Sequence, residues 1–169
     1  DDGTFTRAMV NSAWSNVGQG ILLTGLILFL FLHNFRSILI ITITMPLTIV
    51  VGFLFMNAAG YTINVSTLMA IGMSIGILVT NSIVVLENIV RFQELGEDPL
   101  RSASLGTREV SAAVVASTLT TLAVFLPMVF VRGIAGIMFK QLAYVISFSL
   151  ICSLLVALTL IPMLSSRWL

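Results

Sequence analysis

The sequence predicts an all-α membrane protein, a bundle of five transmembrane helices with a short helix on the cytoplasmic surface. Of its 169 residues, 58% are hydrophobic and only 9% are charged, whereas soluble domains carry about 25% charged residues. The apolar residues form five continuous runs, each close to the roughly 20 residues that a helix needs to cross a bilayer. Unbroken runs also exclude a membrane β-barrel, whose strands alternate apolar and polar residues.

In chain order, the expected spans are residues 13–32, 37–56, 65–90, 110–131 and 142–164. The second, fourth and fifth spans contain Pro46, Pro127 and Pro162, respectively. Proline removes a helical hydrogen bond and its ring clashes with the preceding turn, so we expect a kink at each position.

The links between the spans are short, except for residues 91–109. We expect tight turns at residues 33–36 and 57–64. In the long polar link, Asp98 suits a helix N-cap and Pro99 suits the first helical position. These signals predict a short surface helix that leads into the fourth span.

Basic residues are divided unevenly between the two sides of the expected bundle, and the richer side faces the cytoplasm in membrane proteins. Five arginines lie on the side of the first turn: Arg36, Arg91, Arg101, Arg108 and Arg167. Three basic residues lie on the other side: Arg7, Arg132 and Lys140. The first span is therefore expected to run inward.

The composition also excludes several functions. Eight Lys and Arg against seven Asp and Glu leave a net charge of +1, which is too small to attract a nucleic acid. A single cysteine and a single histidine do not suffice for a His/Cys metal cluster. The sequence has neither a Gly-rich phosphate loop nor a nucleophile with a base, so we expect neither an enzyme nor a bound cofactor.

The third span is unusual because polar side chains recur near its middle, where an unpaired polar group is costly. Residues seven apart return to nearly the same face of a helix. Ser74, Asn81 and Asn88 therefore share one face, which we call the polar seam. Thr80 and Glu87 lie on the adjacent face. By depth, Thr80 and Asn81 lie near the bilayer midplane.

Two interpretations of the polar seam remain open: hydrogen bonds between helices, or the lining of an ion or water path. In the fourth span, Thr118 and Thr121 lie near mid-depth and either bond to their own helix or join the polar seam. Gly72 and Gly76 form a G-x-x-x-G pattern, which lets another backbone approach. We therefore expect the third span to be the central helix.

Glu87 is the only acidic residue well inside an expected span. One interpretation pairs it with Arg91, one helical turn away and near the aqueous edge. The other makes it a proton-accepting carboxylate whose pKa is raised by burial. A structural and a proton-carrying role therefore both stay open for this residue.

Six segments follow one another in the order and with the loop lengths of a known family. They are FLHNFRSILI, MPLTIVVGFLFM, GYTINVSTLMAIGMSIGILV, NSIVVLENIVR, FLPMVFVRGIAGIMFKQ and LVALTLIPMLSSRWL. Through them, nearly the whole chain resembles the first transmembrane repeat of resistance–nodulation–division (RND) efflux permeases, helices two to six of twelve. The resemblance implies a fragment of a larger protein, with residues 1–12 as the tail of a periplasmic domain and 13–169 as the repeat.

The resemblance also implies a function and a set of partners. It implies a multi-pass protein of the bacterial inner membrane that works as a homotrimer and exports drugs or other amphiphiles by antiport. The coupling ion would be H⁺ or Na⁺. The implied partners are the lipid bilayer, the second repeat of the same polypeptide, a periplasmic adaptor and an outer-membrane channel. Because the chain is expected to be part of a larger protein, its polar-seam face should lie open where the second repeat docks.

The chain departs from the family at its proton-coupling position. The family motif G-L-L-V-D-D-A-I-V-V-V-E-N carries two aspartates that take up protons, but this sequence reads GILVTNSIVVLEN, with Thr80 and Asn81 in their places. Neither side chain titrates near neutral pH. Either the second repeat carries the titrating group, or the oxygens of Thr80 and Asn81 help to bind Na⁺, or the repeat is uncoupled.

Two alternatives to transport remain for the chain as a whole. One is a sterol-sensing-like lipid-binding bundle, and the other is a purely structural half-repeat.

Overall fold

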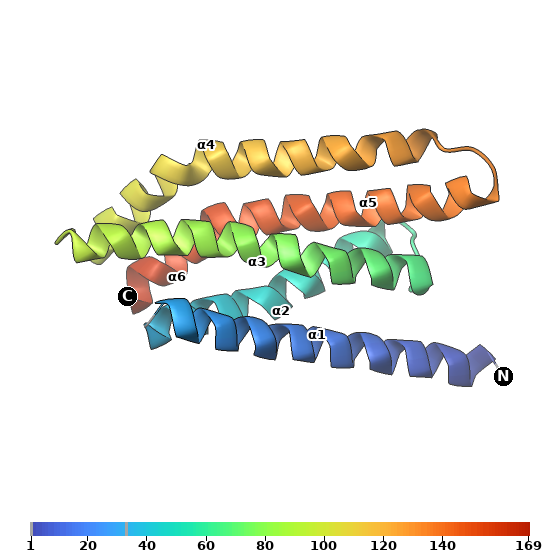
Figure 1. Ribbon diagram of the computed structural model, residues 1–169, viewed down its shortest axis with the longest axis horizontal. Coiled ribbons are helices and arrows are strands. Elements are labelled where there is room, and N and C mark those ends of the chain that lie inside the picture. The colour runs from blue at the N-terminus through green and yellow to red at the C-terminus, as the bar shows by residue number, and fades with distance from the viewer. Residues whose placement is uncertain (1, 33) are drawn as a thin grey trace.

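The computed structural model describes residues 2–32 and 34–169, and this part of the chain is helical without any strand (Figure 1). The long helices are α1 (Asp2–Leu32), α2 (Phe35–Ala58), α3 (Val65–Glu94), α4 (Pro99–Phe125) and α5 (Ile134–Leu155). Shorter helical segments are η1 (Leu126–Phe130), η2 (Val156–Leu160) and α6 (Ile161–Trp168). Five stretches are long and apolar enough to cross a membrane, which confirms the predicted fold class.

Local capping explains where α2 and α3 begin. Asn34 is the N-cap of α2, and its side chain accepts a hydrogen bond from the backbone N–H of Arg36 at 3.2 Å. His33, the first residue of the expected turn, lies outside the described residues. At the start of α3, Asn64 and Thr67 form a reciprocal capping box with bonds of 2.8 and 3.0 Å. Both caps satisfy N–H groups that the first helical turn leaves without partners.

Helix α4 begins where the sequence signals place it, but the expected surface helix is not a separate element. Asp98 caps the helix by accepting a hydrogen bond from the backbone N–H of Arg101 at 3.3 Å, and Pro99 takes the first position. The helix then continues without a break to Phe125. After Pro99, Gly106 is the only glycine or proline before the helix ends at Phe125, and one glycine does not stop a helix.

The three prolines act on their helices differently. Pro46 lies inside α2, which continues past it. Pro127 lies in the 3₁₀ segment η1, where α4 tightens and ends. Pro162 follows the π-helical segment η2, in which the N–H of Ile161 bonds to the carbonyl of Val156. A wider π turn accommodates the carbonyl groups that proline leaves unpaired.

Helix α3 is the central element of the bundle, as expected from its polar residues (Figure 1). It contacts every other long helix, most extensively α4 and α5. Its buried apolar residues include Leu86 and Ile89, which pack with Ile40 of α2 and Ile161 of α6. In contrast, α1 lies at the edge of the bundle, and Leu28 is its only buried residue among those whose side chains are described. The outer surface is therefore apolar and suited to lipid.

Candidate functional site

The polar seam faces the interior of the bundle, so the expectation that it would lie open for a second repeat is wrong, because α4 covers it. The side-chain amide of Asn81 donates a hydrogen bond of 3.1 Å to the hydroxyl of Thr118 in α4, and both residues are buried. Thr118 in turn donates to the carbonyl of Val114 at 2.9 Å. The amide oxygen of Asn81 has no hydrogen-bond partner among the described residues. Asn81 thus joins α3 to α4 and keeps an acceptor free near the midplane.

The other two residues of the polar seam also face protein. Ser74 is buried and donates to the carbonyl of Ala70 at 2.7 Å. The half-buried Asn88 donates to the carbonyl of Gly106 at 2.8 Å and to a carboxylate oxygen of Glu109 at 3.0 Å. The helical spacing therefore places all three residues on one inward-facing side of α3.

Thr80 faces away from the bundle interior, although it is the immediate neighbour of Asn81. It is exposed, and its hydroxyl donates to the carbonyl of Gly76 at 3.0 Å. Successive residues on a helix point about 100° apart, since a turn takes 3.6 residues. The two neighbouring residues therefore open onto different surroundings: Asn81 onto α4, and Thr80 onto the outer surface of this chain.

Glu87 is exposed and does not pair with Arg91. Arg91 instead bonds to Glu109 of α4, to which Asn88 also donates. The pairing with Arg91, one of the two interpretations of Glu87, is therefore wrong, because folding brings α4 alongside the last turns of α3 and supplies the carboxylate of Glu109 instead. In the described part of the chain, Glu87 has no ion-pair or hydrogen-bond partner.

The glycines of the G-x-x-x-G pattern are open rather than packed. A Cβ atom added at Gly72 or Gly76 would meet no atom within 4 Å. Close helix contact occurs at Gly106 instead, where an added Cβ would lie 2.8 Å from Cα and 2.9 Å from N of Ile89. Helical spacing alone does not single out Gly106; the signal in the sequence is that an isolated glycine inside a helix often has a packing reason.

Only one of the two threonines assigned to the polar seam reaches α3. Thr118 bonds to Asn81, whereas Thr121 donates only to the carbonyl of Ser117, at 2.9 Å. Such back-bonding satisfies a hydroxyl within its own helix. Thr121 therefore adds a polar atom to α4 without linking the two helices.

Titratable and metal-binding groups are scarce around the midplane. Within residues 2–32 and 34–169, no three His, Cys, Asp or Glu side chains gather as a metal site would require.

Tyr61 lies in the link between α2 and α3. The pKa of its phenol is raised above the ordinary value, chiefly by burial and also by the nearby Tyr144. That phenol stays protonated at neutral pH and cannot carry a coupling proton.

Removing Asn88 is expected to weaken the contact between α3 and α4 more than removing Arg91. Asn88→Ala removes the 2.8 Å hydrogen bond that joins α3 to the carbonyl of buried Gly106 in α4, a loss of about 1 kcal/mol in the free energy of unfolding. Arg91→Ala breaks a pair whose side chains are about half exposed, at 53% and 50%, so water screens most of the interaction. Thermal unfolding of the two variants checks this order, and an equal loss of stability would contradict it.

The fold and the site define a multi-pass helical membrane protein whose central helix presents polar groups at mid-depth. The chain belongs to the AcrB/AcrD/AcrF family, whose sequence profile matches residues 1–169. The resemblance to RND permeases is thereby confirmed.

Several curated relatives support the same assignment. The chain is 36% identical over 161 residues to an uncharacterized transporter of Haemophilus influenzae, covering 95% of this chain and 16% of the relative. It is 39% identical over 158 residues to multidrug resistance protein MdtC of Escherichia coli O139:H28, covering 94% of this chain and 15% of the relative. It is 38% identical over 161 residues to MdtC of Pectobacterium atrosepticum, covering 95% of this chain and 16% of the relative. The chain thus spans only 15–16% of the length of these relatives.

Proposed function

We propose that this chain is the first membrane repeat of a secondary exporter of drugs or other amphiphiles in the bacterial inner membrane. The observation that carries the proposal is the buried Asn81–Thr118 hydrogen bond at mid-depth, beside an Asn81 oxygen that is free to accept another bond. The names of the relatives, multidrug resistance protein and transporter, support the same function. The repeat would pass an ion-driven movement of α3 to substrate-binding domains elsewhere in the polypeptide.

The exposed side of α3 is the proposed docking face for the second repeat. Gly72, Gly76 and Thr80 line this side, and small residues let two helices approach closely in a membrane. Thr80 would then lie between the repeats rather than in lipid. The remaining partners, a homotrimer, a periplasmic adaptor and an outer-membrane channel, are proposed from the family alone.

The coupling proton is proposed to bind in the second repeat, because Thr80 and Asn81 cannot titrate near neutral pH. Sodium coupling is the competing mechanism, since a hydroxyl and an amide oxygen are both oxygen ligands. In either case, Asn81 would contribute a hydrogen bond or an oxygen and no charge.

Flux driven by one ion gradient at a time tests the proposal. The full-length protein is reconstituted in vesicles, and transport of an amphiphilic dye is followed after a proton or a sodium gradient is imposed. We expect the proton gradient to drive transport. Transport with sodium alone would assign sodium as the coupling ion, and no transport with either would make the repeat a structural one.

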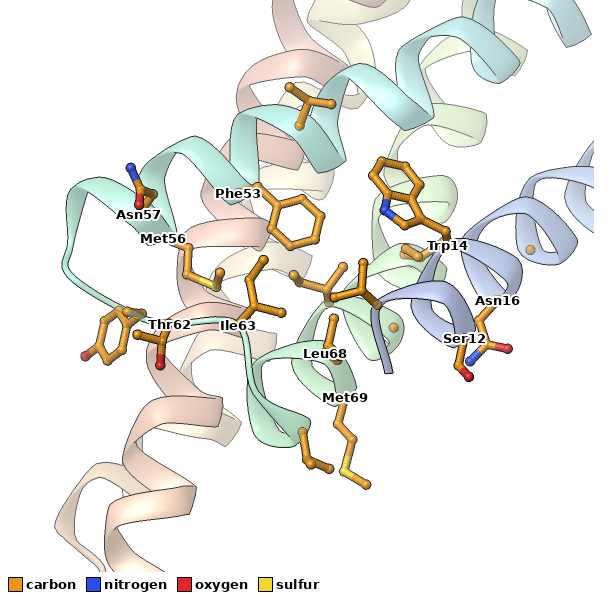
Figure 2. Close-up of a pocket in the computed structure, with 18 of the residues that line it drawn as sticks. Ser12, Trp14, Asn16, Phe53, Met56, Asn57, Thr62, Ile63, Leu68 and Met69 are labelled. Carbon is orange, nitrogen blue, oxygen red and sulfur yellow. The ribbon is translucent and has the colours of Figure 1, made fainter. Parts of the chain in front are cut away.

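A second candidate function, lipid binding, is supported by a groove beside α3. The groove has a volume of about 1170 Å³ and lies between α1, the end of α2 and the start of α3 (Figure 2). Trp14, Phe53, Leu68 and Met69 line it, with Asn57 near its edge. An apolar groove with polar groups at its margin suits an amphiphile such as a sterol. Labelling of α1 and α2 by a photoreactive sterol in the full-length protein, competed by unlabelled sterol, would favour this function.

A further inference from the structure

A small cavity lies among α2, α3 and α5; it shares Ile71 and Ile75 with the lining of the groove but does not include Asn81 or Thr118. Its volume is about 10 Å³. Three hydroxyl side chains line it, one from each helix: Thr48, Ser74 and Ser149. The rest of the lining is apolar and includes Ile49 and Leu78. The cavity is therefore a polar pocket within the hydrophobic interior.

The hydrogen bonds around this cavity leave two acceptors and one donor without partners. Thr48 donates to the carbonyl of Thr44 at 2.8 Å, and Ser74 donates to that of Ala70 at 2.7 Å. Each of these hydroxyl oxygens still has lone pairs to accept a bond. Ser149 makes no hydrogen bond to any described residue, whereas Ser147 on the same helix donates to the carbonyl of Ala143 at 2.7 Å. The hydroxyl of Ser149 is thus free to donate into the cavity.

We propose that the cavity binds one water molecule, which accepts a hydrogen bond from Ser149 and donates to Thr48 and Ser74. A cavity of about 10–15 Å³ holds one water, which requires two to four polar partners. A metal cation does not fit the site, because three neutral hydroxyls provide no charge to offset it at this depth. The ligand is therefore neutral and small.

The water would extend the hydrogen bonding of the polar seam along the same side of α3 to a second level. Ser74 lies seven residues before Asn81, about 10 Å along the helix axis at 1.5 Å per residue. Asn81 links α3 to α4 directly. The water would link α3 to α2 and α5, so that polar contacts would hold the central helix at two levels along its axis.

High-resolution structures of the full-length protein test the proposal, using the wild type, Ser149→Ala and the matched control Ser147→Ala. We expect a density peak within hydrogen-bond distance of Thr48, Ser74 and Ser149 in the wild type and the control, and its loss in Ser149→Ala. An empty cavity in the wild type, or a Ser149 hydroxyl bonded to its own helix there, would overturn the proposal.

A double-mutant cycle gives a second measurement in the same protein. Thr48→Val and Ser149→Ala each remove one partner of the same water, so their effects on the melting temperature should be less than additive when combined. Thr48→Val with Ser147→Ala should be additive. Additivity in both cycles would overturn the proposal. If a variant fails to fold, the density in the wild-type cavity alone decides whether the proposal holds.

Discussion

Gly106→Ala is expected to lower the free energy of unfolding by about 2 kcal/mol, within the range for overpacked cores. The added methyl group would lie 2.8 Å from Cα of Ile89, and backbone atoms cannot rotate aside as a long side chain can. Helices α3 and α4 must therefore separate. Their separation also stretches the 2.8 Å bond from Asn88 to the carbonyl of Gly106. Thermal unfolding of the full-length protein, followed by circular dichroism, measures the loss.

Gly18→Ala is the matched control for this variant. Gly18 is exposed on α1, and a Cβ atom there would meet nothing within 4 Å. Alanine in a helix interior is favoured over glycine by about 0.5–1 kcal/mol, so this variant should be as stable as the wild type or slightly more stable. If both variants behave alike, the close contact between α3 and α4 is not present in the folded protein.

The contrast between Gly106 and the G-x-x-x-G glycines shows what helical spacing does and does not predict. Spacing places Gly72 and Gly76 on one side of α3, but a Cβ atom added at either position would meet no atom of the described residues within 4 Å. Gly106 is a point of close contact because α4 crosses the backbone of α3 there. Which faces of two helices meet depends on the loop between them and on every other packing contact, and neither is encoded within the one helix.

The polar groups also show which features helical spacing predicts and which depend on the packing of one helix against another. The seven-residue repeat places Ser74, Asn81 and Asn88 on one face of α3, because the period of a helix is a local property. The pairing of Glu87 with Arg91 was also a local inference, yet Arg91 bonds to Glu109, eighteen residues further along the chain. Long side chains near a helix end select among several partners, so that choice is fixed by tertiary structure.

Transport is expected to fall about tenfold or more in Asn81→Leu and to remain near the wild-type rate in Thr118→Val. Both substitutions remove the 3.1 Å bond between Asn81 and Thr118 and keep a similar side-chain volume. Only Asn81→Leu also removes the free amide oxygen. If coupling uses that oxygen to accept a hydrogen bond or an ion, the variants separate, and a tenfold loss corresponds to about 1.4 kcal/mol in the barrier.

Folding must be measured beside transport for this comparison to be decisive. The interhelical hydrogen bond is worth about 0.6 kcal/mol in a membrane, so both variants should unfold at nearly the same temperature. The assay uses the reconstituted full-length protein under an imposed ion gradient. Equal losses of stability and transport in both variants would mean that Asn81 serves only to hold α4. In that case the coupling path does not pass through this face of α3, and the second repeat must contain it entirely.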